Sequence, residues 1–255
     1  MSKVLDDIKK RAAALGKTIV LPEGEDKRVV KAASDSVKEG IAKIVLLGNE
    51  AEIKANNPDV DLSGVTIVDP LTYEKAEAYA DLLYELRKEK GMTKELAHET
   101  IKKDYTMFGA LMLKAGDVDG MVSGACHSTA NTLRPGLQVI KTAKGTPIVS
   151  AYFLMIAPEC GNKYCEDGCY IYADAGLNQN PTSEQLAYIA QSSAKSAKAI
   201  AGIEPRIAFL SHSTKGSAKH ADVDKVVAAV EKFHEIEPDA LADGELQFDA
   251  AIVPE

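Results

Sequence analysis

Strand-like and helix-like patterns alternate along the first half of this chain, and the alternation restricts the fold more than any other feature. Residues 18–24 (TIVLPEG) form a short apolar run that ends in a Pro/Gly turn, which is typical of a buried strand. Residues 25–39 place apolar side chains at helical spacing until Gly40, and residues 42–48 form a second apolar run. A strand, a helix and a strand in this order predict a βαβ unit with parallel strands.

The alternation continues to about residue 124. A third apolar run at 65–69 leads into a long helical pattern that Gly91 ends, and a further helix is expected from Thr93 to about Ala115. Residues 119–124 (DGMVSG) then return to the sheet. Because each helix covers a face of the sheet as the chain crosses between parallel strands, this pattern predicts an α/β layer.

The pattern changes after the flexible stretch KTAKGTP, and we expect a domain boundary near residue 145. This gives a first α/β domain at 1–145 and a second at 146–255. Two strand-like runs, at 146–156 and 169–176, predict an antiparallel pair or a hairpin with a long loop. A helix, a strand and a helix are expected next, at 183–202, 206–213 and 223–236.

Composition limits the kinds of partner that the chain can have. The formal net charge is −8, which argues against a broad basic face for nucleic acid. No apolar run approaches the roughly 20 residues that cross a bilayer, and the first residues lack the apolar stretch of a signal peptide. We therefore expect a cytoplasmic protein with no nucleic-acid or membrane partner, and reduced thiols at its four cysteines.

Residues 121–142 form the first segment that could bind a ligand. A strand enters a loop of small and hydroxyl residues, and a helix follows. Ligands of an open parallel sheet bind at the carboxyl ends of its strands, and helix starts attract anions. Ser128, Thr129 and Thr132 add hydroxyl donors, and Arg134 adds a planar fork suited to phosphate. The residues alone leave open an anion site or an N-capping loop with a surface arginine.

Residues 209–227 repeat the order of strand, small-residue loop and helix. The loop does not match the pattern G-x-x-x-x-G-K-[ST], so it is not a nucleotide-binding P-loop. Its composition fits either a phosphate cradle or a capped turn with a solvated lysine. Two such loops in one α/β protein favour a single anionic ligand that both loops face. The candidate residues here are Ser213, Thr214, Lys215, Gly216 and Ser217.

Arg87 lies near a predicted helix end, together with Lys88 and Lys90. Cations near a helix C-terminus are stabilising without any ligand, so this position by itself favours a structural role.

The cysteines give little support for a metal site or a nucleophile. The spacing of Cys160, Cys165 and Cys169 is not that of a usual zinc pair, and we expect a reduced loop there. Cys126 stands beside His127, but a nucleophile and its base usually come from distant segments. We therefore expect no metal centre and no thiol nucleophile.

Four stretches, taken together, resemble phosphate acetyltransferases. They are SGACHSTANTLRP (123–135), ADAGLNQNPTSEQLA (173–187), STKGSAK (213–219) and DGELQFDAA (243–251). LPEGEDKRV (21–29) and ELRKEKGMT (85–93) match as well, and the similarity is collinear over essentially the whole chain. The wider family includes phosphate butyryltransferases, but the two stretches STKGSAK and DGELQFDAA point to the acetyl enzyme.

The resemblance implies a three-layer α/β/α architecture like that of isocitrate/isopropylmalate dehydrogenase, with two domains, a cleft between them and a homodimeric assembly. It implies transfer of an acetyl group between coenzyme A and phosphate, with coenzyme A as substrate and no metal or redox cofactor. The family's two coenzyme A-binding arginines match Arg87 and Arg134, which overrules the structural interpretation of Arg87. The loops around Ser128–Thr129 and Ser213–Ser217 would then line the cleft.

The chain also departs from the family. The family ties catalysis to a Ser-Arg pair and an Asp in a C-terminal segment that would lie beyond Glu255, so we expect a fragment with an uncovered apolar face. Asn131 stands where an Asp is common. Three alternatives stay open: a fragment that binds coenzyme A without turnover, a phosphate butyryltransferase, and a dehydrogenase of the same fold, against which the missing nucleotide fingerprint speaks.

Overall fold

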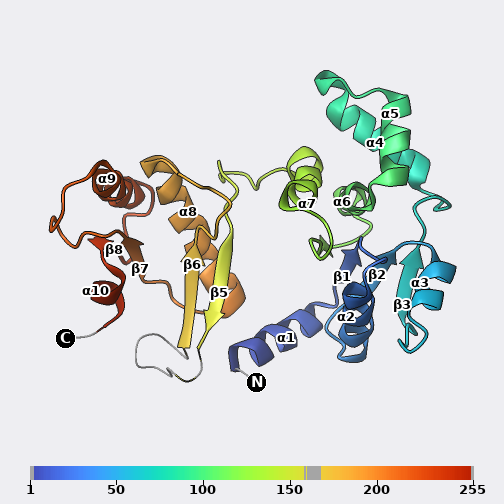
Figure 1. The fold of residues 1–255 in the computed structure, drawn as a ribbon, viewed down its shortest axis with the longest axis horizontal. Helices are drawn as coiled ribbons and strands as arrows, with labels where there is room; N and C mark the ends of the chain where they lie inside the picture. Colours follow the sequence, from blue (N-terminus) through green and yellow to red (C-terminus); the bar gives the residue numbers. More distant parts are fainter. Residues whose placement is uncertain (1–2, 158, 160–167, 254–255) are drawn as a thin grey trace. The chain divides into compact units, whose positions relative to one another are not determined.

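The computed structural model describes residues 3–157, 159 and 168–253, and it has two compact units. One unit comprises Met1–Ile8 and Thr142–Glu255, and the other comprises Lys9–Lys141. Each unit contains strands with helices packed against them (Figure 1), so the predicted α/β class is confirmed.

The unit Lys9–Lys141 is built on a four-stranded sheet in the order β3-β2-β1-β4. All neighbours in this sheet are parallel, which confirms the predicted βαβ unit. β1 lies between β2 and β4, so the loops that follow β1 and β4 begin side by side at one edge of the sheet. The strands are β1 (Thr18–Leu21), β2 (Lys43–Leu47), β3 (Val65–Val68) and β4 (Gly120–Met121).

Successive side chains of β1 and β2 point to opposite faces of the sheet, and each face carries its own apolar core. Val20, Val45 and Leu47 pack with residues of α6 (Tyr105–Ala115). Leu21, Ile44 and Leu46 pack on the other face. That face is covered by α2 (Lys27–Lys38) and α3 (Glu50–Asn56). The sheet is therefore buried between two layers of helices, which explains why its strands read as unbroken apolar runs.

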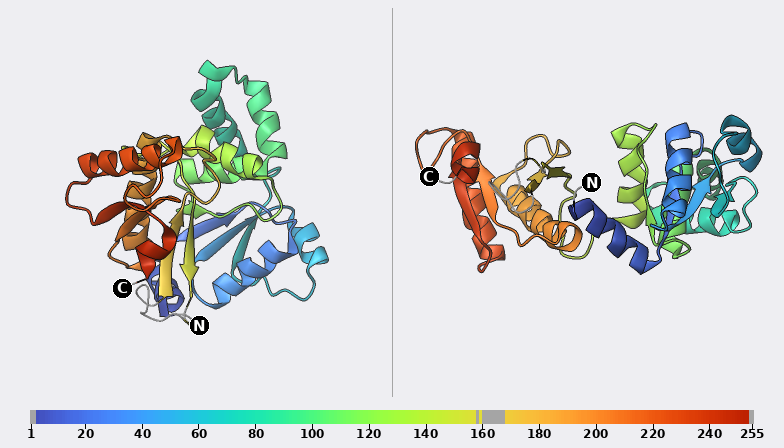
Figure 2. Two further views of the ribbon diagram at one scale, coloured as in Figure 1. Left: turned by 60° about the vertical axis from the view of Figure 1, so that its left-hand side comes forward. Right: turned by 90° about the horizontal axis from the view of Figure 1, so that it is seen from below.

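The helix predicted from Thr93 to Ala115 is wrong in one respect, because two helices occupy this stretch. α5 (Lys94–Lys103) ends at Asp104, which has the extended angles φ −115 and ψ 90. The Asp104 carboxylate accepts a hydrogen bond from the Met107 N–H at 2.8 Å and so caps α6. α4 (Ala76–Arg87) lies beside α5, and the two extend together from the sheet layer (Figures 1 and 2).

The other unit has two separate two-stranded sheets. β5 (Tyr152–Ile156) and β6 (Cys169–Ala173) are antiparallel, as one of the two sequence interpretations predicted. β7 (Ile207–Leu210) and β8 (Ala242–Leu246) are parallel. The helices are α8 (Ser183–Ser196), which continues as a π-helical turn over Ala197–Ala201, α9 (Ala221–Ile236) and α10 (Phe248–Ile252).

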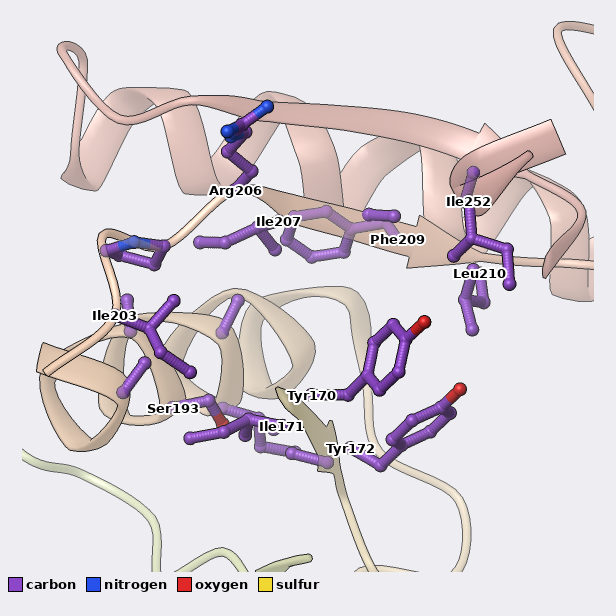
Figure 3. Close-up of a pocket in the computed structure, with 18 of the residues that line it drawn as sticks. Tyr170, Ile171, Tyr172, Ser193, Ile203, Arg206, Ile207, Phe209, Leu210 and Ile252 are labelled. Atoms are coloured by element: carbon purple, nitrogen blue, oxygen red, sulfur yellow. The ribbon is translucent and has the colours of Figure 1, made fainter. Parts of the chain in front are cut away.

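β6 and β7 both line an apolar cavity of about 920 Å³ (Figure 3). The ring of Tyr172 and the side chains of Ile207 and Ile252 are among its walls. Nearby apolar side chains are open to solvent, with Leu210 and Phe248 each 43% exposed. This unit therefore has an apolar surface that is open to solvent.

The remaining helices are α1 (Lys3–Leu15) and α7 (Thr129–Pro135), the latter followed by a π-helical turn over Gly136–Ile140. Among the described helices, none combines the length and apolar character that a bilayer-crossing segment needs.

The core of the unit Lys9–Lys141 gives a direct stability test. Leu83 of α4 is fully buried, whereas Leu71 is 58% exposed. We expect Leu83→Ala to lower the free energy of unfolding by about 2–5 kcal/mol, because it removes buried methyl groups and leaves a cavity. Leu71→Ala should change it by less than about 0.5 kcal/mol. Urea denaturation followed by circular dichroism measures both, and equal effects would contradict the assigned core.

Candidate functional site

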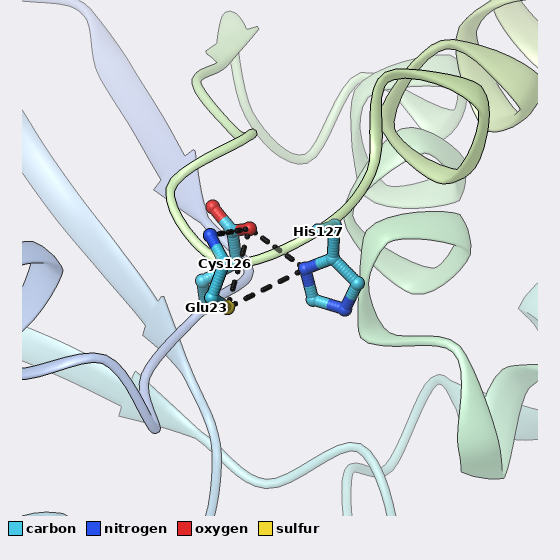
Figure 4. Close-up of side chains that lie close together, drawn as sticks. All are labelled: Glu23, Cys126 and His127. Carbon is cyan, nitrogen blue, oxygen red and sulfur yellow. Dashed lines mark hydrogen bonds and ion pairs between the residues drawn. The ribbon is translucent and has the colours of Figure 1, made fainter.

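Glu23 joins the loop after β1 to the loop after β4. Its side chain is 1% exposed, and its two carboxylate oxygens accept hydrogen bonds from three consecutive backbone N–H groups. These belong to Gly124, Ala125 and Cys126, at 2.8, 2.9 and 3.0 Å. His127 Nδ1 lies 2.7 Å from Oε1 of the same carboxylate (Figure 4). One buried carboxylate therefore fixes four successive residues of the β4–α7 loop.

These contacts determine the protonation state of Glu23. Burial alone raises the pKa of a carboxyl group, because it disfavours the charged form. Here the bond with His127 and the three backbone N–H donors outweigh burial and lower the pKa of Glu23 to about 2. Glu23 is therefore a carboxylate at neutral pH, and the short contact requires a proton on His127 Nδ1.

His127 and Cys126 respond to Glu23 in different ways. The hydrogen bond with Glu23 raises the pKa of His127, which favours the imidazolium. The Cys126 sulfur lies 3.4 Å from carboxylate oxygens of both Glu23 and Glu25. Loss of solvent and these two carboxylates raise the pKa of Cys126 to about 12. The raised pKa keeps the thiol protonated at neutral pH.

The ligand atoms of Glu23, Cys126 and His127 all lie within 4.8 Å of one another, as in a metal site. The Glu23 carboxylate, however, is already bonded to four protein donors. His127 Nδ1 turns its proton toward that carboxylate rather than a lone pair toward an ion. The cluster is better suited to holding the loop than to holding a metal. Of the three other thiols considered for a metal, Cys160 and Cys165 lie outside the described residues, and Cys169 is buried.

The predicted residues Ser128, Thr129 and Arg134 follow directly on this anchored loop. Ser128 is the N-cap of α7, and its hydroxyl accepts a hydrogen bond from the Asn131 N–H at 3.3 Å. Thr129 opens the helix and is exposed. The Arg134 guanidinium donates to the Asn131 side-chain oxygen. Within the described part of the chain, no carboxylate pairs with Arg134.

Arg87, the last residue of α4, is half-buried. Its guanidinium has no hydrogen-bond or ion-pair partner among residues 3–157, 159 and 168–253. Its neighbour Lys88 differs, because its ammonium is paired with Glu85 at 2.6 Å. Arg28 differs as well, since it binds Asp26 and the carbonyl of Ala125. Arg87 and Arg134 are thus cations whose charge no described carboxylate balances, and both belong to the unit Lys9–Lys141.

The second predicted loop, at 213–217, belongs to the other unit and is anchored by Glu245. Glu245 is 3% exposed and is the second-last residue of β8, which pairs with β7. Its Oε1 accepts hydrogen bonds from the Gly216 N–H at 2.7 Å and the Ser213 hydroxyl at 2.9 Å. These bonds lower the pKa of Glu245. Ser213 is fully buried, so its hydroxyl stabilises the loop from within.

The other polar residues of this loop form hydrogen bonds and ion pairs within the protein. Ser217 Oγ accepts the Thr214 N–H at 2.9 Å, and Thr214 Oγ1 accepts the Gln247 N–H at 2.9 Å. The ammonium of Lys215 is paired with Asp243 and donates to the Gly244 carbonyl. Lys215 and Gly216 have φ of 47 and 82, so the chain turns through two left-handed residues here. That the two loops face a common ligand stays a prediction.

Sequence reasoning missed Glu23 and Glu245, although both lie within stretches that carried the resemblance. The available signal was a glutamate at the end of an apolar strand that enters a tight turn, as in TIVLPEG. A carboxylate at that position can reach the loop of the neighbouring parallel strand. Strand pairing places Glu23 beside the loop after β4 and Glu245 beside the loop after β7, and no local sequence pattern predicts that pairing.

Fold and loops together define an α/β protein that carries hydroxyl and arginine side chains after its parallel strands. The phosphate acetyl/butaryl transferase family matches residues 3–255. A phosphate acetyltransferase of Acetivibrio thermocellus is 54% identical over 98% of this chain and 75% of its own length. One from Escherichia coli is 49% identical over 95% of this chain and 33% of its own length.

Solved structures agree with the sequence comparison. A phosphotransacetylase from Streptococcus pyogenes superposes with a TM-score of 0.90 at 40% identity, over 100% of this chain and 76% of its own. The chain therefore belongs to the phosphate acetyl/butaryl transferase family, as the quoted motifs predicted. It spans about three quarters of the length of the Acetivibrio relative.

The lowered pKa of Glu23 predicts how the stability of the protein depends on pH. This pKa falls from the ordinary 4.5 to about 2, so the stabilisation by Glu23 is present above about pH 4.5 and is lost as the pH falls toward 2. We expect Glu23→Gln to lower the free energy of unfolding by about 3 kcal/mol at neutral pH, with the difference from wild type narrowing over that acidic window.

Urea denaturation at a series of pH values measures this difference. Glu25→Gln is the matched control, because Glu25 is exposed in the same turn. A gap between wild type and Glu23→Gln that stays constant down to pH 2 would contradict the assigned carboxylate.

Proposed function

We propose that this chain transfers an acetyl group between phosphate and coenzyme A, interconverting acetyl-CoA plus phosphate with acetyl phosphate plus coenzyme A. Relatives at 49% and 54% identity are named phosphate acetyltransferases, which supports the acetyl over the butyryl reaction. The structural observation that carries the proposal is the pair of arginines, Arg87 and Arg134, whose charges no described carboxylate balances. Such guanidinium groups suit the phosphates of coenzyme A and acetyl phosphate.

The chemistry explains why these donors are needed. The thiolate of coenzyme A attacks the acetyl carbonyl, the carbonyl–oxygen bond to phosphate breaks, and phosphate leaves with the electron pair. Negative charge grows on the carbonyl oxygen and on the departing phosphate, and positioned donors stabilise it. A thiol with an ordinary pKa near 8.5 is mostly protonated at neutral pH, so a general base assists. In this scheme the reaction requires no metal or redox cofactor.

Binding without turnover is the second candidate. The predicted binding residues, Arg87 and Arg134, lie within the chain, and a chain that holds coenzyme A through them alone would bind it without turnover. We further propose that the protein is cytoplasmic and homodimeric. Light scattering coupled to size-exclusion chromatography tests the dimer.

The arginines provide the test of function. With coenzyme A and acetyl phosphate as substrates, thioester formation is followed by its ultraviolet absorbance. We expect Arg87→Ala and Arg134→Ala each to lower kcat/KM by about tenfold or more, since each removes a charged hydrogen-bond donor to phosphate. Lys88→Ala is the matched control, because Lys88 is the neighbouring cation but is paired with Glu85.

Calorimetric titration with coenzyme A distinguishes the two candidates. Coenzyme A binding without thioester formation would support binding alone. Wild-type rates in both arginine variants would refute the proposed binding residues.

A further inference from the structure

His127 is the one member of the Glu23 cluster whose outward side has no assigned role. Its side chain is 33% exposed, while the carboxylate behind it is buried. Nδ1 faces Glu23, and Nε2 lies on the far side of the ring (Figure 4). Nε2 has no hydrogen-bond partner within the described residues. The ring is thus held at one nitrogen and open at the other.

The neighbouring residues on the chain are those proposed to meet phosphate. Ser128 and Thr129 follow His127 directly at the start of α7, and Arg134 lies in the same helix. Hydrogen bonds to three consecutive residues before His127 fix the backbone, and the contact between Nδ1 and Glu23 at 2.7 Å orients the ring. The loop N–H groups of Gly124, Ala125 and Cys126 point at Glu23 and are not available to a substrate. At these three positions the backbone therefore offers an anion no donor.

The charges around the ring favour its protonated form. Glu23 and Glu25 in the turn after β1 and Asp104 at the α5–α6 junction all raise the pKa of His127, Glu23 most of all. The neutral Cys126 thiol lies 3.6 Å from Nδ1. The charge of Glu23 is shared among four donors inside the protein. The Nε2–H of the imidazolium, in contrast, is directed away from that carboxylate.

We propose that His127 is a further anion-binding residue, whose Nε2–H donates to a phosphoryl oxygen of substrate, and that Glu23 is its positioning residue. The proposal rests on the proposed acetyl transfer for the identity of the substrate. The recognised chemistry is a phosphoryl group, which both acetyl phosphate and coenzyme A carry. No proton is transferred in this role, because the imidazolium binds as a fixed cation.

Sulfate binding tests the proposal without requiring turnover. Sulfate resembles phosphate but keeps its charge from about pH 5.5 to about 8.5, a window around the ordinary His pKa of 6.5. Because the pKa of His127 is raised, the imidazolium persists to higher pH than usual and is lost as the pH rises through that value. We expect sulfate affinity, measured by calorimetry, to fall by about tenfold across the window in wild type. In His127→Gln it should be low and independent of pH.

Two further variants complete the experiment. His98→Gln is the matched control, because His98 also stands beside a glutamate, Glu77, at 3.4 Å, but on α5. The sulfate affinity of His98→Gln should depend on pH as that of the wild-type protein does. Glu23→Gln should move the loss of affinity to lower pH, since the partner that raises the pKa of His127 is weakened. A His127→Gln curve that parallels wild type would overturn the proposal.

Kinetic measurements distinguish the source of the phosphoryl group. If His127→Gln raises the KM for acetyl phosphate alone by roughly tenfold, His127 binds that substrate. If it raises the KM for coenzyme A alone, His127 binds coenzyme A. Thioester formation with both KM values unchanged in His127→Gln would overturn the proposal. If sulfate binding depends on pH and on His127 but the wild-type protein forms no thioester, the anion site is supported and the proposed function is refuted.

Discussion

The carboxylate of Glu23 connects segments that are 101 residues apart in sequence, and the geometry of the whole β4–α7 loop depends on it. A buried charge is costly unless hydrogen bonds compensate it. Four donors from the second segment provide that compensation, so the carboxylate and the loop stabilise each other. The next two residues are the partly exposed His127 and Ser128, the N-cap of α7, and this contact holds both in place.

Glu245 forms a comparable contact in the other unit. In both cases a carboxylate close to the end of one parallel strand accepts hydrogen bonds from N–H groups of the loop that follows the neighbouring strand. Strand pairing brings the two segments together, and the carboxylate then fixes the loop. A P-loop works in the opposite sense, because its N–H groups point outward to phosphate. Here the N–H groups of Gly124, Ala125, Cys126 and Gly216 are bound to the protein itself.

Local patterns in the sequence predicted much of the fold. The apolar runs of β1 and β2 and the intervening helix were clear because both faces of that sheet are buried. The break at Asp104 was missed, since one capping carboxylate interrupts an otherwise continuous helical pattern. Ser128 and Arg134 were expected from residue types that follow a strand. Glu23 was not expected, because its role depends on β4 pairing with β1 rather than with β3, a long-range choice that no local pattern encodes.

The inward orientation of the loop N–H groups has a consequence for how such a site changes over time. Backbone donors are present whatever the side chains are, so a cradle made of them tolerates substitution. The proposed site relies on imidazole, hydroxyl and guanidinium groups, so a substitution of one of these side chains removes a donor. Under the proposed function, each such donor can be lost through a single codon change while the loop that Glu23 holds keeps its shape.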